Sequence, residues 1–179
     1  MSSLQKVLQV EADKRNLSSN DVLRLMDWAD NVAQVESNKI ATRTQGDSEQ
    51  GIGRGKYQFE STKGSGAAKT AATRFFNWEK QNDVLEIPKE DREELYKEDP
   101  DFSKLSEETQ DALFIIHHSL HPKTPLTDIA KGKVQQSEAW LKYHWAGNDK
   151  DKSSKQQQWY KEIELPKKAK IANTFAEAM

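Results

Sequence analysis

Residues 18–36, SSNDVLRLMDWADNVAQVE, predict the helix on which both the fold and the candidate chemistry depend. Ser18 is a favourable N-cap residue, and Asp21 three residues later completes a capping-box pattern. Apolar residues then recur at the three- and four-residue spacing of one helical stripe: Val22, Leu25, Met26, Ala29, Val32 and Ala33. The pattern predicts a single helix over residues 19–36.

Glu36 occupies a position on this stripe where the periodicity calls for an apolar residue. Burial disfavours the charged form of a carboxylate. A glutamic acid that stays protonated near neutral pH is what general-acid catalysis requires. Periodicity alone leaves a second interpretation open, in which the helix end frays and Glu36 reaches water.

The composition indicates one very polar domain of 179 residues, with 31% charged and 35% hydrophobic residues. Five Trp, six Phe and four Tyr argue against disorder, because disordered chains are poor in aromatic residues. The formal net charge of -2 gives no general attraction to nucleic acid or to anionic membranes, so neither partner is expected. The absence of cysteine excludes disulfides and thiolate zinc sites.

The N-terminal residues 1–11 lack a basic region followed by an apolar run, and no apolar stretch approaches about 18 residues. We therefore expect no cleavable signal peptide and no membrane insertion. A protein of this kind that acts outside the cytoplasm needs another route of delivery.

Along the chain, the sequence predicts a mainly helical domain with one irregular, glycine-bearing insert over residues 37–66. A small hairpin is expected within residues 42–59. The other expected helices cover residues 4–15, 67–80, 91–97, 106–120, 125–132 and 134–146. Residues 148–158 suggest a polar linker, and the last twenty residues suggest either a docked helix or a tail.

A Gly-Arg-Gly-Lys-Tyr-Gln run at residues 53–58 follows Glu36 by about twenty residues. Its glycines allow a tight turn or a close approach of backbone to ligand. Tyr57 and Gln58 add an aromatic face beside amide donors and acceptors, a pairing suited to carbohydrate. An ordinary turn is the other interpretation of the same run.

These elements resemble the lysozyme-like lytic transglycosylases, and most closely the lambda-type phage endolysins. The resemblance rests on an apolar helix ending in Glu36-Ser37 and on the glycine-rich run ending in Tyr57-Gln58. It continues through residues 105–112 and 129–140, which are similar to two helical segments of that family. Residues 143–147, Tyr-His-Trp-Ala-Gly, are loosely similar to an Ala-Tyr-Asn-Ala-Gly element of the soluble transglycosylases.

The resemblance implies an α+β lysozyme-like domain over residues 1–148, with its core at 18–148 and a β-hairpin beside an active-site cleft. Residues 149–179 would form the linker and C-terminal helix or tail. The implied reaction cleaves the β-1,4 bond between N-acetylmuramic acid and N-acetylglucosamine, with Glu36 as acid and base and a 1,6-anhydro product. The implied substrate-binding residues are Ser37, Gly55, Tyr57, Gln58, Tyr143 and Trp145.

No metal or cofactor is implied, and the expected partners are peptidoglycan strands and, for a virion component, other virion proteins. A phage-encoded enzyme made in the host cytoplasm would reach the wall through a membrane lesion, as with holin-type release, or inside a virion.

Two alternatives remain open from the sequence. A hydrolytic muramidase needs a second carboxylate, which Asp47 or Glu49 in the irregular segment would supply. A non-catalytic wall-binding or virion structural module would keep the fold without the chemistry, although such a module has no need for an acid on an apolar stripe.

The remaining candidates favour structural roles. His117, His118 and His121 cluster without an accompanying His-Glu-x-x-His pattern, so helix-end packing is the preferred interpretation over a metal site. A set of aromatic residues is expected in the core: Trp28, Phe75, Phe76, Trp78 and Phe114.

Overall fold

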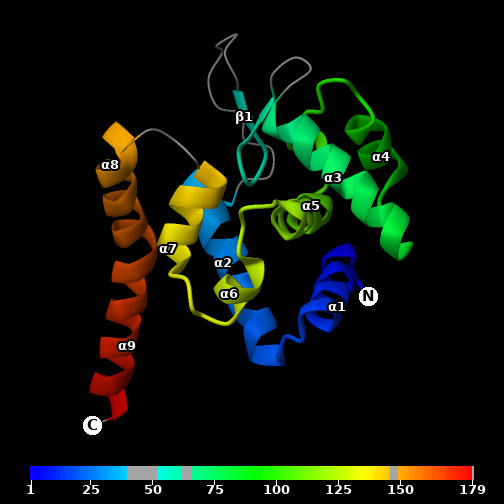
Figure 1. Ribbon diagram of the computed structural model, residues 1–179. Helices are drawn as coiled ribbons and strands as arrows, with labels where there is room; N and C mark the ends of the chain where they lie inside the picture. The colour runs from blue at the N-terminus through cyan, green and yellow to red at the C-terminus, as the bar shows by residue number, and fades with distance from the viewer. Residues whose placement is uncertain (40–51, 62–65, 146–148, 179) are drawn as a thin grey trace.

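The computed structural model describes residues 1–39, 52–61, 66–145 and 149–178 of the chain. Within these ranges the protein is mainly helical, with one small antiparallel sheet, in agreement with the predicted fold class (Figure 1). The chain begins with α1 (Ser3–Arg15) and α2 (Ser19–Ser37), and the strands β1 (Ile52–Arg54) and β2 (Phe59–Ser61) follow. The later elements are α3 (Ala67–Asn82), α4 (Lys89–Leu95), η1 (Phe102–Lys104), α5 (Glu107–Leu120), α6 (Leu126–Ala130), α7 (Gln136–Ala139), η2 (Trp140–Trp145), α8 (Asp149–Trp159), η3 (Tyr160–Glu164) and α9 (Leu165–Ala178).

Helix α2 forms as its sequence predicts and extends one residue beyond Glu36. The Ser18 side chain accepts a hydrogen bond from the backbone of Asp21, and the Asp21 carboxylate accepts one from the Ser18 backbone, so the capping box is complete. The helix ends at Asn38, which adopts a left-handed conformation with φ of 55°. The end of α2 is therefore ordered helix at Glu36, and the side chain of Glu36 is half-buried.

The hairpin pairs Gly53 with Glu60 and Arg54 with Phe59. Its turn, residues 55–58, begins at Gly55 with φ of +74°, and a Cβ there would lie 2.4 Å from Oε1 of Gln110 and 3.0 Å from the carbonyl oxygen of Phe102. Glycine is therefore required by backbone conformation and by space. Residues 42–51 of the predicted hairpin segment lie outside the described ranges.

The core lies around α5, which contacts both α1 and α3. Four of the five aromatic residues expected in the core are fully buried: Trp28, Phe75, Trp78 and Phe114. Phe76 is half-buried and stacks on Tyr96 with ring centroids 4.4 Å apart. Glu11 is a buried carboxylate that accepts a hydrogen bond from Trp78 Nε1 (2.7 Å) and pairs with Arg15 (2.9 Å).

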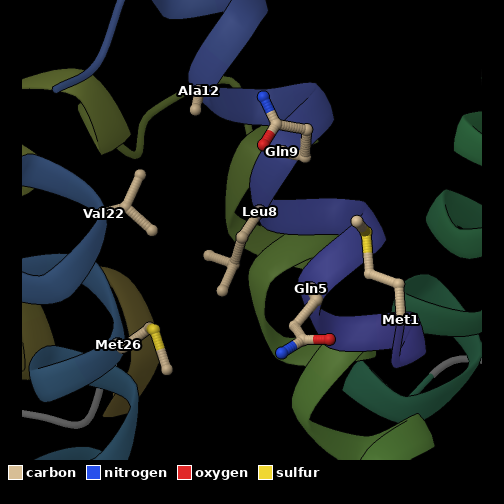
Figure 2. Close-up of a pocket in the computed structure, with 7 residues that line it drawn as sticks. All are labelled: Met1, Gln5, Leu8, Gln9, Ala12, Val22 and Met26. Atoms are coloured by element: carbon tan, nitrogen blue, oxygen red, sulfur yellow. The ribbon is translucent and has the colours of Figure 1, made fainter. Parts of the chain in front are cut away.

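A hollow of about 520 Å³ lies between α1 and the first half of α2 (Figure 2). Its lining is mostly apolar and consists of Met1, Gln5, Leu8, Gln9, Ala12, Val22 and Met26. Met26 is ten residues before Glu36, a separation of about 15 Å along a helix. This hollow is therefore separate from the surroundings of Glu36.

The predicted polar linker is wrong, because residues 149–159 form helix α8, and α8 continues through η3 into α9. The run from α8 to α9 extends along one side of the molecule (Figure 1). Trp159 stacks on Trp140 with ring centroids 5.3 Å apart, Ile163 is buried, and Gln158 donates a hydrogen bond to the carbonyl oxygen of Val35. The Lys and Gln residues of this segment are good helix formers, and two apolar anchors hold a helix whose other faces are polar.

Pro166 lies near the start of α9, directly after the π-helical segment η3. Proline has no backbone N–H and its ring collides with the carbonyl four residues earlier. A π-type turn widens the helix at this point, which allows the chain to remain helical across the proline.

The predicted helix over residues 134–146 is instead divided between α7 and the π-helical η2. The other predicted helices are present, with ends that differ from the prediction by a few residues. In the described part of the chain, no helix combines the length and apolar character needed to cross a membrane.

Candidate functional site

Glu36 projects from the last turn of α2 toward η2. Its Oε1 accepts a hydrogen bond of 2.6 Å from the indole Nε1 of Trp140, which is itself fully buried. The contact joins residues 104 positions apart in the sequence. The hydrogen bond fixes the position of the Glu36 carboxylate, which remains partly exposed to solvent.

Ser37 joins the end of α2 to the hairpin turn. It is 0% exposed, and its hydroxyl lies 2.7 Å from the carbonyl oxygen of Lys56 and 3.1 Å from that of Ala33. The structure thus places Ser37 in an internal contact that sets the position of the turn relative to Glu36.

The π-helical segment η2 supplies two side chains to the surroundings of Glu36, Trp140 and His144. The carboxylate charge of Glu36 favours the protonated form of His144. π-Helical turns are uncommon and occur frequently at functional sites. Here such a turn presents an indole N–H and an imidazole on the side of the helix that faces α2.

His144 belongs to a chain of hydrogen bonds that fixes its tautomer. Its Nε2 lies 2.9 Å from the carbonyl oxygen of Tyr57, which can only accept, so Nε2 carries the proton. Its Nδ1 then accepts from Nε2 of His118 at 3.2 Å. The Nδ1 of His118 is left to accept from the hydroxyl of Thr124 at 3.3 Å. These tautomers are assigned from the partners.

Both imidazoles of this chain are held in the neutral form. Burial lowers the pKa of His144, although the charge of Glu36 and the hydrogen bond to Tyr57 act in the opposite direction. Burial also places the pKa of His118 well below its ordinary value, with a smaller contribution from His144. A neutral imidazole does not form an ion pair with a carboxylate, so His144 and Glu36 do not form one.

Tyr57 is only 2% exposed, and its ring stacks on Phe114 with centroids 4.2 Å apart. Its hydroxyl donates to Oδ1 of Asp111 at 2.8 Å. Burial, together with the charge of Asp111, raises the pKa of Tyr57 well above its ordinary value. The structure thus places the ring of Tyr57 in the core, where its packing against Phe114 anchors the hairpin turn.

Lys56, the residue before Tyr57 in the turn, also contacts Asp111. Its Nζ lies 2.8 Å from Asp111 and 3.0 Å from Glu107. Burial alone would lower the pKa of Lys56, but the two carboxylates raise it above its ordinary value. Burial also raises the pKa of Asp111, against the effect of Lys56. These contacts fasten the turn to α5.

Gly55 and Gln58 define the two ends of the turn. Gln58 is 9% exposed, adopts a left-handed backbone with φ of 51°, and donates from Nε2 to the carbonyl oxygen of Gly55 at 2.6 Å. Left-handed backbone is uncommon for a residue other than glycine. The surrounding contacts therefore over-determine the conformation of this turn.

Tyr143 and Trp145 are both half-buried on η2. Tyr143 lines a hollow together with three basic side chains, and Lys155 lies over the ring of Trp145 at 5.9 Å. Asp47 and Glu49, the candidate second acids, lie outside the described residues. Among the residues that the structure describes, no three His, Asp or Glu side chains gather to hold a metal ion.

The sequence did not predict the hydrogen bond between Trp140 and Glu36 or the effect of the Glu36 charge on His144. A signal for them exists in the four-residue spacing of Trp140 and His144, which places both on one face of a helix. The sequence could not show that this face turns toward α2.

Comparisons of the chain with protein-family models, with curated proteins and with solved structures each find no match.

Proposed function

We propose that this protein is a peptidoglycan lytic transglycosylase with a lysozyme-like fold, and that Glu36 is its catalytic acid and base. The observation that supports the proposal is the environment of Glu36: a half-buried carboxylate at the end of α2, held by the Trp140 indole N–H beside a neutral His144. An acid so placed has the orientation and partial desolvation that proton transfer to a glycosidic oxygen requires.

The proposed reaction needs one carboxyl group. Protonated Glu36 donates its proton to the oxygen of the β-1,4 bond between N-acetylmuramic acid and N-acetylglucosamine, and the bond from that oxygen to the anomeric carbon breaks. The carboxylate then removes the proton of the C6 hydroxyl of the muramic acid residue, whose oxygen bonds to the anomeric carbon. The products are a 1,6-anhydromuramic end and a free hydroxyl, and Glu36 has regained its proton.

Trp140 assists the second step, in which the Glu36 carboxylate removes the proton of the C6 hydroxyl. Its N–H donates to Glu36 Oε1, and a donor to an ionised oxygen forms a stronger hydrogen bond than a donor to a neutral one. The indole therefore stabilises the carboxylate after the first proton transfer and holds it in place for the second.

In this proposal the substrate is the glycan strand of the cell wall, and the protein is phage-encoded, reaching the wall through a membrane lesion or as part of a virion. Ser37, Gly55, Tyr57 and Gln58 then serve the site mainly by building the turn beside Glu36, because three of these side chains make internal hydrogen bonds. Tyr143 and Trp145 remain the candidates for direct contact with sugar.

The proposal is tested by digesting purified peptidoglycan and analysing the released fragments by mass spectrometry. We expect 1,6-anhydro muropeptides from the wild type and none from Glu36→Gln, while the exposed control Glu138→Gln retains activity. Reducing ends would instead indicate hydrolysis, and substitution of Asp47 and Glu49 by their amides would then identify the second acid. Release of nothing by the wild type, with binding to sacculi retained, would indicate a wall-binding module.

A further inference from the structure

A second hollow lies between the end of α5 and η2. Its volume is about 510 Å³, and it is lined by His121, Lys123, Lys142 and Tyr143. His121 caps the C-terminal end of α5, Lys123 lies in the turn that follows, and the other two residues belong to η2. The lining offers two ammonium groups, an imidazole and a phenol, and no carboxylate.

In the described part of the chain, no ion pair compensates the positive charge at this end of α5. Among the described residues, neither lysine of the hollow forms an ion pair, and neither does the nearby Arg74 of α3. Arg74 is half-buried, and its Nη1 lies 3.0 Å from Nε2 of His117 in place of a carboxylate. The rings of His117 and His121 have centroids 5.9 Å apart, which connects Arg74 to the lining of the hollow.

The pKa of His121 depends on its burial and on two of these cations. Burial lowers the pKa of His121, and the charges of Arg74 and Lys123 lower it further. A chain with a formal net charge of -2 thus carries a local region of positive potential with no internal counterion among the described residues. A bound anion would relieve this repulsion.

The hollow and the hydrogen-bond partner of Glu36 belong to the same short element, η2, but lie on different sides of it. Lys142 and Tyr143 stand between Trp140, which holds Glu36, and His144. A helix with its side chains is about 10–12 Å across. The hollow therefore begins within about one helix diameter of Trp140, and a flexible substituent of that length, carried by a ligand at Glu36, is long enough to reach it.

We propose that this hollow binds carboxylate groups of the stem peptides that intact peptidoglycan carries on its muramic acid residues. The inference rests on the proposed function for the identity of the ligand. Carboxylates match the two ammonium donors, and the hydroxyl of Tyr143 is a further hydrogen-bond donor beside them. The protein then prefers peptide-bearing strands over peptide-free glycan.

The test measures binding of a free stem pentapeptide to the full chain and to Lys123→Gln/Lys142→Gln. A matched control is Lys80→Gln/Lys89→Gln, which removes two exposed lysines of α3 and α4 and changes the net charge equally. We expect the double variant in the hollow to raise the Kd about tenfold or more, because charge-assisted hydrogen bonds are lost. The control should leave Kd unchanged, and added salt should weaken binding to the wild type.

Two further probes identify the chemistry. The same peptide with its carboxyl groups amidated should bind the wild type as weakly as the unmodified peptide binds the double variant. Equal affinity of the two peptides, or an unchanged Kd in the double variant, overturns the inference. Tighter binding of inorganic phosphate than of the pentapeptide overturns it too, because the hollow would then be a general anion site.

Turnover separates this inference from the proposed function. On intact peptidoglycan the double variant should raise KM and leave kcat close to that of the wild type, and on peptide-free glycan the two proteins should behave alike. If the wild type and the double variant cleave peptidoglycan with the same KM, the hollow does not bind the stem peptide, while the proposed function stands. If the wild type binds the pentapeptide through the two lysines but cleaves nothing, the proposed function is wrong, while the carboxylate site stands.

Discussion

The indole Nε1 of Trp140 donates a 2.6 Å hydrogen bond to Oε1 of Glu36, joining the π-helical segment η2 to the last turn of α2. Trp140 is fully buried and stacks on Trp159, so the direction of its N–H is set by the core. The carboxylate is consequently oriented by a side chain that cannot move without disturbing the packing.

Removal of this donor should impair catalysis more than folding. Trp140→Phe keeps an aromatic ring and loses the N–H, and a hydrogen bond to a charged group contributes about 1.5–3 kcal/mol. We expect kcat for peptidoglycan cleavage to fall about 10- to 100-fold. The matched control is Trp159→Phe, whose ring contacts Trp140 but not Glu36. Equal losses in the two variants would show that packing, and not the N–H, is responsible.

The charge of Glu36 should be detectable at His144. Because the carboxylate favours the protonated imidazole, Glu36→Gln should lower the pKa of His144 further. Imidazole NMR signals followed during a pH titration measure this shift and also report whether the proton of neutral His144 is on Nε2. A proton on Nδ1 would contradict the hydrogen-bond chain through His118, whether or not the protein is an enzyme.

Gly55 should be far less tolerant of substitution than Gly132, although both have positive φ. A Cβ at Gly55 would lie 2.4 Å from Gln110 Oε1, whereas one at Gly132 would meet only the Arg24 side chain at 3.6 Å. We expect Gly55→Ala to lower the free energy of unfolding by about 2–4 kcal/mol, and Gly132→Ala by about 1 kcal/mol. Urea denaturation measures both, and equal effects would contradict the steric explanation.

Protein stability should decrease as the pH falls below about 6.5, partly through His117. Burial, with a smaller contribution from Arg74, lowers the pKa of His117 to about 2, whereas the unfolded chain takes up this proton near about 6.5. Below that pH the unfolded state binds more protons, so stability is lost on acidification toward about pH 2.

The size of this effect can be measured by urea denaturation at two pH values. Between about pH 7 and about pH 5, His117 should account for about 2 kcal/mol of the loss. His117→Gln should therefore show a smaller difference between the two pH values than the wild type, and the more exposed His121→Gln should change it less. The same pH dependence in His117→Gln as in the wild type would contradict the prediction.

Docking of the C-terminal helices should depend on Trp159. The side chain is 3% exposed, and replacing a buried Trp by Ala costs about 3–5 kcal/mol. Trp159→Ala should therefore lower the free energy of unfolding by about this amount and make residues 149–178 sensitive to protease. Tyr160→Ala, at an exposed neighbouring position, is the control. Protease resistance equal to that of the wild type would show that other contacts hold this segment.

Much of the helical fold could be predicted locally. The capping box at Ser18, most of the apolar stripe of α2 and the expected burial of Trp28 depend on residues a few positions apart, and they are confirmed, whereas Met26 of the predicted stripe is exposed. The linker prediction failed because residues 149–158 have no apolar stripe of their own. Their helix is held by Trp159 and Ile163, and the surface that these two cover belongs to other elements.

The candidate site shows the same division between local and long-range information. The sequence by itself determined that Glu36 stands on the apolar side of an amphipathic helix and that a glycine-rich turn follows, because periodicity and glycine content are local properties. Only the tertiary structure decided that Trp140 donates a hydrogen bond to Glu36, and that Tyr57 packs inward against Phe114. These contacts join residues more than fifty positions apart, and the packing of whole elements, not the spacing of residues, brings such pairs together.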